Sequence, residues 1–158
     1  MPIDKNELRQ VMGHFATGVT VITTVNKDGQ PQGLTANAFT SVSLNPPLLL
    51  ISVDKKAESW PAFEESKVFT VNILADDQEA LSRKFAVSGG NKFEGVAYRV
   101  GANGAAILEG ALATIECKLY AAYDGGDHSI YLGEIQEAAI REGKPLLFFR
   151  GGYRSLGD

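Results

Sequence analysis

The chain has little of what several classes of protein require. Its single cysteine, Cys117, cannot form an internal disulfide, and with only two histidines, far apart in the sequence, it gives no recognisable metal-ligand cluster. The longest apolar run, residues 48–51, is far too short to cross a bilayer, and the first residues lack the apolar stretch of a signal peptide. We therefore expect a soluble protein of the reducing cytoplasm, with no metal and no membrane segment.

Positive charge is also in short supply. The 15 Lys and Arg residues face 19 Asp and Glu residues, which gives a formal net charge of −4 at pH 7. Proteins that bind nucleic acid present a basic surface, so nucleic acid is not an expected partner. No repeat, linker or low-complexity stretch divides the 158 residues, and this length suits one full core. We expect a single domain over residues 1–158.

The N-terminal residues predict a short amphipathic helix. Asp4, followed three residues later by Glu7, is typical of a helix start. The apolar residues that then recur with helical spacing are Leu8, Val11, Met12 and Phe15. We expect this helix to end near Gly18.

The rest of the chain predicts mainly β structure. Strands are expected at 19–25, from 30 onward, and at 48–53, 68–74, 146–149 and beyond residue 98, with turns at 26–29, 103–104 and 124–127. Two short helices are expected at 55–65 and 76–85, the second capped by Asp76. Few helices, no regular βαβ alternation and no GxGxxG after a strand favour a barrel over a dinucleotide-binding parallel sheet.

Residues 33–48, GLTANAFTSVSLNPPL, form an uncharged segment rich in small and hydroxyl-bearing side chains. Such a segment can bring bare backbone against a flat ligand, because Gly33, Ala36 and Ala38 have little side chain to hold it away. Composition alone fits equally well with a Thr/Ser-rich edge strand followed by a core strand. Phe39 and Val42 are expected to turn into the core.

Four stretches in order carry a family resemblance. They read GVTVIT at 18–23, GLTANAFTSVSLNPPL at 33–48, GDHSIYLG at 126–133 and PLLFFRGGY at 145–153. Nearly from end to end, the chain resembles the short-chain NAD(P)H:flavin oxidoreductases, which supply reduced flavin to two-component monooxygenases. The resemblance implies a mainly β, FMN-binding split β-barrel, Greek-key-like, with a few short flanking helices. It also implies a homodimer with the flavin near the subunit boundary, FMN or FAD, NADH or NADPH as hydride donor, and a flavin-dependent monooxygenase partner.

The stretch 52–59 has N–H groups, two ammonium groups and two hydroxyls that could converge on a phosphate, although alone it is more typical of a solvated turn. The resemblance implies backbone contacts from residues 34–37 to the pyrimidine edge of a flavin. In full, it implies cofactor contacts from Leu34, Thr35, Ala36, Asn37, Ser41, Ser52, Val53, Asp54, Lys55, Ser59, Asn72, Ser82, Arg83 and Phe85. As alternatives, Phe85 is a core anchor and Arg83 a surface charge.

The glycine-rich turn at 124–128 allows a tight hairpin that projects an imidazole. A lone turn histidine is usually just solvated, but the resemblance implies that His128 contacts NAD(P)H, with Tyr153 near the same place. No acid–base pair accompanies His128, and none is needed, because hydride passes directly between stacked nicotinamide and flavin rings. We therefore name no catalytic residue.

Two other functions are compatible with the same barrel. One is a non-catalytic flavin-binding protein that transfers electrons, and the other is an enzyme like pyridoxamine-phosphate oxidase. The GDH turn favours the reductase, because it offers NAD(P)H a place that the rivals do not require. The lack of an extra cationic cluster argues against a pyridoxal phosphate site, and the lack of an obvious arginine pair for a 2′-phosphate favours NADH. The sequence leaves FMN and FAD both open.

Overall fold

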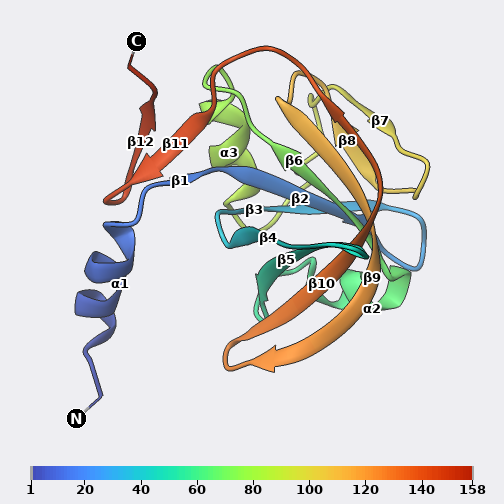
Figure 1. Cartoon of the computed structure of the whole chain (residues 1–158). Helices are drawn as coiled ribbons and strands as arrows, with labels where there is room; N and C mark the ends of the chain where they lie inside the picture. The colour runs from blue at the N-terminus through green and yellow to red at the C-terminus, as the bar shows by residue number, and fades with distance from the viewer. Residues whose placement is uncertain (1, 158) are drawn as a thin grey trace.

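The computed structural model describes residues 2–157 and is mainly β (Figure 1). Three helices and twelve strands follow in the order α1 (Lys5–Gly13), β1 (Thr17–Gly18), β2 (Thr20–Val25), β3 (Pro31–Ala36), β4 (Phe39–Leu44), β5 (Pro47–Asp54), α2 (Trp60–Ser66), β6 (Val68–Ile73), α3 (Glu79–Phe85), β7 (Tyr98–Val100), β8 (Ala106–Leu108), β9 (Ala113–Gly125), β10 (His128–Ile140), β11 (Leu146–Phe149) and β12 (Gly152–Ser155) among these residues. The expected mainly β class with a few short helices is confirmed. None of the described helices is long and apolar enough to cross a membrane.

A curved seven-stranded sheet forms the body of the molecule, in the order β3-β2-β6-β9-β10-β5-β4 (Figure 1). All its neighbouring strands pair antiparallel, including the expected β2–β3 hairpin. A three-stranded sheet, β1-β11-β12, and the hairpin β7–β8 flank it. The described strands leave the large sheet with two edges, β3 and β4, which is a split-barrel-like arrangement. These edge strands are consecutive in the chain, so residues 33–44 run along both edges.

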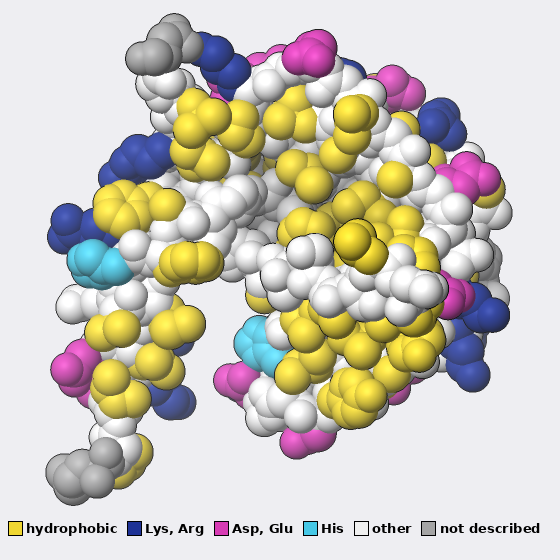
Figure 2. Space-filling model, in the orientation of Figure 1, with side chains coloured by type: hydrophobic (Ala, Val, Ile, Leu, Met, Phe, Trp, Pro, Cys, Tyr) yellow, Lys and Arg dark blue, Asp and Glu magenta, His cyan; other side chains and the backbone are white. Residues whose placement is uncertain are grey.

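Helix α1 begins as predicted and ends earlier than predicted. The Asp4 carboxylate accepts hydrogen bonds from the N–H groups of Asn6 and Glu7, at 3.0 and 3.2 Å. The helix ends at Gly13, because β1 starts at Thr17. No residue of α1 is buried, and its apolar residues stay exposed on a helix that stands apart from the body (Figures 1 and 2).

The other two helices start later than predicted. Residues 55–59 form turns, because the Asp54 carboxylate accepts from the N–H of Lys56 at 2.8 Å, and α2 begins only at Trp60. Helix α3 begins at Glu79, and the predicted Asp76 cap is wrong: Gln78 is the N-cap, and the Asp76 N–H donates to the Lys144 carbonyl. Strand β12 was not predicted, because its sequence, GYRS, has no run of alternating apolar residues.

The core consists of two clusters of buried side chains. The first surrounds Phe63, Phe69 and Tyr131, with the rings of Phe63 and Tyr131 stacked at 5.6 Å. The second surrounds Phe85 and Phe93, whose rings meet edge to face at 5.0 Å. Cys117 is buried in the first cluster, and Phe39 packs against it, both as expected. The expected burial of Val42 is wrong, because Val42 is 48% exposed on edge strand β4.

Candidate functional site

Edge strand β3 carries the segment predicted to approach the flavin ring. Leu34, Thr35 and Ala36 are half-buried on this strand, and Asn37 follows it, exposed. One side of β3 pairs with β2, while no described strand pairs with its other side. Backbone N–H and C=O groups on an unpaired strand edge are free to bond a ligand. Ser41, on β4, lies exposed at the other edge of the sheet.

A second group of predicted residues gathers at α3. Ser82 is fully buried; its carbonyl accepts from the Thr35 hydroxyl at 2.6 Å, and its hydroxyl lies 2.7 Å from the Tyr153 hydroxyl. The Arg83 guanidinium lies 4.8 Å from the centre of the Tyr153 ring and is also bonded to Glu79. The structure therefore joins Ser82 and Arg83 of α3 to Thr35 and Tyr153, which are remote from them in the sequence.

The family resemblance implies Tyr153 near His128, and its contact with NAD(P)H stays a prediction. His128 begins β10 at the tip of the β9–β10 hairpin, whereas Tyr153 lies on β12. Figure 1 shows β12 at the upper left and this hairpin tip at the lower left, apart from one another. Within one chain, Tyr153 is thus not near His128. Its neighbours are predicted flavin residues, because β12 pairs with β11 beside α3 and not with the long hairpin.

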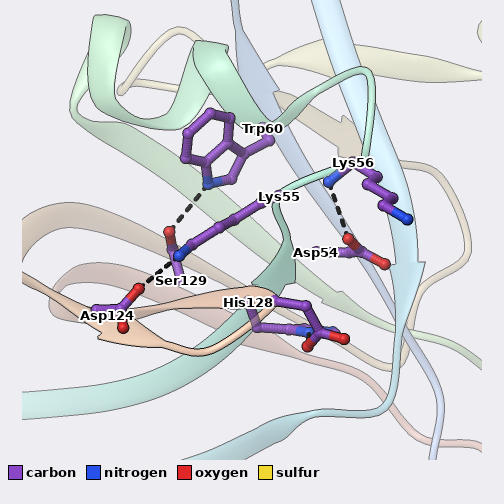
Figure 3. Close-up of polar contacts among 8 residues, drawn as sticks. Asp54, Lys55, Lys56, Trp60, Asp124, His128 and Ser129 are labelled. Atoms are coloured by element: carbon purple, nitrogen blue, oxygen red, sulfur yellow. Dashed lines mark hydrogen bonds and ion pairs between the residues drawn. The ribbon is translucent and has the colours of Figure 1, made fainter.

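The end of β5 and the tip of the β9–β10 hairpin form a third group (Figure 3). Lys55 and Asp124 form an ion pair, and the Lys55 N–H donates to the Asp127 carbonyl at 3.0 Å. The hydrogen bond and the charge of Lys55 lower the pKa of the Asp124 carboxyl. The ammonium group predicted to meet a phosphate is therefore tied to the hairpin. Trp60, which the sequence reasoning did not single out, fixes the same hairpin by donating to the Ser129 hydroxyl at 3.0 Å.

His128 sits where the hairpin rejoins the sheet. It is half-buried, pairs with Asp54 across the β5–β10 ladder, and its Nδ1 lies 2.7 Å from the Asp127 carboxylate. This neighbour lowers the pKa of Asp127, so Asp127 is ionised near neutral pH. Gly126 adopts φ of 78° in the two-residue turn, which confirms the expected glycine turn.

Ser59 is the predicted residue whose surroundings fit a ligand best. It precedes α2, only 4% of it is exposed, and its Oγ has no hydrogen-bond partner among residues 2–157. A buried hydroxyl without a partner is costly, so its place is explained if a ligand completes its bonding. Helix α2 has only seven residues, so we ascribe no anion binding to its N-terminus. Of the neighbouring predicted residues, Ser52 is half-buried, and Val53 is fully buried and can contribute only backbone.

Two predicted residues have their side chains in the core. Asn72 is fully buried, and its amide nitrogen donates to the Val21 carbonyl at 3.0 Å while its oxygen accepts from the Leu108 N–H at 2.9 Å. Phe85 is fully buried in the second cluster, which is the alternative considered for it. A Cβ on Gly33 would lie 3.0 Å from the Phe85 ring, so Gly33 is small for core packing rather than for a ligand.

The sequence reasoning missed a groove beside these groups. It has a volume of about 580 Å³. Its lining residues come from 30–33, 58–59, 90–93 and Tyr98, and Ser59 is the one among them that was named as a cofactor contact. No motif could have revealed it, because three distant segments build it. Residues 2–157 hold no group of three or more His, Cys, Asp or Glu side chains arranged to bind a metal ion.

Comparisons with known proteins place the chain in a family. Residues 12–157 match the model described as the flavin reductase like domain. The chain is 41% identical over 152 residues to a flavin reductase of Pseudomonas putida, which covers 96% of this chain and 89% of the relative. It is 42% identical over 155 residues to the reductase subunit HsaB of a flavin-dependent monooxygenase of Rhodococcus jostii, covering 98% and 79%.

Two further comparisons name both cofactors of such proteins. The FMN reductase (NADH) SmoA of Agrobacterium fabrum is 41% identical over 150 residues, covering 95% of this chain and 85% of the relative. The solved structure of an NADH:FAD oxidoreductase of Streptomyces globisporus superposes with a TM-score of 0.94 at 40% identity, covering 100% of this chain and 96% of that one. The chain described here therefore belongs to the flavin reductase-like domain family.

Proposed function

We propose that this protein is an NAD(P)H:flavin oxidoreductase that reduces FMN or FAD and supplies the reduced flavin to a partner monooxygenase. The observation that carries the proposal is the unpaired outer edge of β3, where Leu34–Ala36 are half-buried. Gly33, at the start of this stretch, lines the same groove as Ser59, whose buried hydroxyl has no hydrogen-bond partner among residues 2–157. A flat ring with a polar edge and a phosphate tail matches this combination. Relatives over nearly the whole chain carry names with the same activity.

The residues bind and orient, and no side chain has to transfer a proton. A bound flavin supplies N5 as the acceptor of a hydride from the nicotinamide, so the protein's task is to hold the two rings together. The β3 backbone holds the pyrimidine edge, and Ser59 with Lys55 holds the phosphate. For the latter, the exposed Lys55–Asp124 pair has to share its ammonium group with the phosphate, which costs little because exposed pairs are weak.

His128 fits a nicotinamide carboxamide through the nitrogen that Asp127 does not occupy. An ionised carboxylate can only accept, so Nδ1 carries the proton in the Asp127 hydrogen bond. In the neutral ring Nε2 is then an acceptor, and it can accept from the carboxamide NH₂ group. The proposed role of His128 is therefore to position the nicotinamide.

The direct test is anaerobic stopped-flow mixing of the protein with NADH or NADPH and with FMN or FAD. We expect flavin bleaching in at least one of the four pairings, faster with NADH, and loose retention of the flavin during purification. Tight flavin binding without bleaching in any pairing would favour the electron-transfer protein instead.

Ser59→Ala tests the phosphate assignment. Because the hydroxyl has no partner in the protein, its removal breaks no internal hydrogen bond and should leave the free energy of unfolding nearly unchanged. FMN affinity should fall by about 1–3 kcal/mol, while the affinity for riboflavin, which lacks the phosphate, should not change. Equal losses for both ligands would remove Ser59 from the phosphate site.

We further propose a homodimer, formed over the apolar face of α1. Val11, Met12 and Phe15 are 57%, 65% and 77% exposed, and the space-filling view shows apolar side chains of the helix facing an open notch (Figure 2). Val11→Glu should convert a dimer to a monomer in light scattering, whereas Gln10→Glu, which adds the same charge beside it, should not. We place this protein in the cytoplasm, where NADH and monooxygenase partners are present and the buried Cys117 stays reduced.

A further inference from the structure

The hairpin tip that carries His128 is poorly supported by its own strands. Residues 124–127 are exposed, and His128 begins the strand that leads away from them. Its ladder partners are Asp54 on β5 and Gly125 on β9. Segments with exposed backbone and few buried contacts open locally at low cost, so a side chain at such a tip is held in one place only if another element supports it.

Lys55 supplies two contacts to the tip. Its N–H donates to the Asp127 carbonyl at 3.0 Å, and its ammonium group pairs with the Asp124 carboxylate. The Asp124 side chain is 78% exposed, and exposed ion pairs contribute little. In the proposed flavin site, this ammonium group is also shared with the phosphate. The ion pair is therefore a weak support for the hairpin when flavin is bound.

Trp60 supplies a support that does not involve the phosphate. Its indole Nε1–H donates to the Ser129 hydroxyl at 3.0 Å, and Ser129 is only 7% exposed. Trp60 begins α2 and packs against the first core cluster, so the donor belongs to a well-packed element. A hydrogen bond screened from water is electrostatically stronger than an exposed one. This bond therefore ties the start of β10 to the body of the protein.

We propose that Trp60 is a positioning residue for the nicotinamide, acting through Ser129 on His128. The inference rests on the proposed reductase function, in which His128 contacts the nicotinamide. Successive side chains of a strand point to opposite faces, so Ser129 meets Trp60 on one face and His128 projects from the other (Figure 3). Trp60 thus fixes the backbone from which the imidazole projects, without touching the nicotinamide.

Two variants remove this hydrogen bond from opposite sides. Trp60→Phe keeps an aromatic ring on the core and loses the donor, whereas Ser129→Ala loses the acceptor. We expect either variant to raise KM for NADH about fivefold and to leave kcat and the flavin Kd within a factor of about two. The double variant should resemble each single variant, because all three lack the same bond. Loss of folded protein would instead lower kcat and leave KM unchanged.

The cycle with His128→Ala tests the route of the effect. In that background, Trp60→Phe should change KM for NADH no further, because Trp60 acts through His128. Tyr123→Phe, which removes an exposed hydroxyl from the same hairpin, is the matched control and should leave KM unchanged. Additive effects of Trp60→Phe and His128→Ala would overturn the proposal. So would a weaker flavin Kd with an unchanged KM for NADH, because Trp60 would then serve the adjoining Ser59.

Hydrogen exchange gives a readout that needs no activity. The Lys55 amide is bonded to Asp127 only while the hairpin is docked, so its exchange should become about fivefold faster in both Trp60→Phe and Ser129→Ala. The Asn26 amide, in the β2–β3 turn, should exchange as before. If NADH reduces neither flavin in the unaltered protein, the reductase function fails, and faster Lys55 exchange still supports the link from Trp60 to the hairpin. Unchanged Lys55 exchange overturns that link in either case.

Discussion

Replacing Asn72 with Ala tests whether this residue belongs to the flavin site or to the core. Its amide group is fully buried and joins three strands, because it bonds Val21 on β2 and Leu108 on β8 from its own place on β6. The amide nitrogen also lies 3.3 Å from the Thr23 hydroxyl. In the variant, the Leu108 N–H loses its hydrogen-bond acceptor and the Val21 carbonyl loses one of its donors.

The expected cost follows from these contacts. Leaving a buried polar group unsatisfied costs about 1–3 kcal/mol, and two groups are affected, so we expect Asn72→Ala to lower the free energy of unfolding by about 3 kcal/mol. For a domain of this size, that corresponds to a fall of roughly 6–12 °C in Tm. Flavin affinity, measured well below the transition, should stay within a factor of about two, because the side chain has no open surface.

The assay is urea unfolding at one fixed protein concentration, together with FMN and FAD titration. Asn6→Ala, at an exposed asparagine of α1, is the control and should change stability by less than about 0.5 kcal/mol. The reasoning would be refuted by an Asn72→Ala protein of nearly normal stability that binds flavin ten times more weakly. That result would indicate that the Asn72 side chain contacts the flavin.

Three further outcomes are expected. His128→Ala should raise KM for the nicotinamide and leave the flavin Kd unchanged, and steady-state kinetics with each substrate varied would show the opposite pattern if His128 contacts the flavin. In Lys55→Ala, the pKa of Asp124 should rise toward its ordinary value, which a carboxyl NMR titration can follow. In the unaltered protein, the contribution of this ion pair to folding stability is present above the ordinary pKa of the carboxyl and is lost as pH falls through the lowered pKa. Cys117, whose pKa burial raises to about 12, should resist alkylation at pH 8 until the protein unfolds, and fast labelling of the native protein would contradict its buried position.

Much of the fold follows from local sequence. The hairpin of β2 and β3, the buried strand β5 and the Asp4 cap depend on patterns that neighbouring residues complete, so the sequence predicts them. Helix α3 was misplaced at its start, because an aspartate is a common cap but the local turn gave that position to Gln78. Val42 was misplaced because alternation gives the two faces of a strand but not which edge the strand occupies.

The candidate site was predictable only in pieces. Family resemblance names Ser59 and His128 as candidates. Neither the ion pair that engages Lys55 nor the bond from Trp60 to Ser129 has a signal in the sequence, because their partners are 69 residues away. The groove was even less predictable from the sequence, because its walls come from three segments that meet only after the sheet has formed. Its lining residues Lys92 and Tyr98 belong to no motif and come together only through that meeting.

The positions of His128 and Tyr153 connect the activity to the proposed dimer. Within one chain, His128 begins β10 at the tip of the hairpin, whereas Tyr153 lies on β12 and is bonded to Ser82. We propose that both residues serve the same nicotinamide, as the family resemblance implies, with His128 supplied by a second copy. The second copy would bind the exposed apolar face of α1. This helix is followed in the chain by β1, which pairs with β11, the neighbour of β12 and Tyr153.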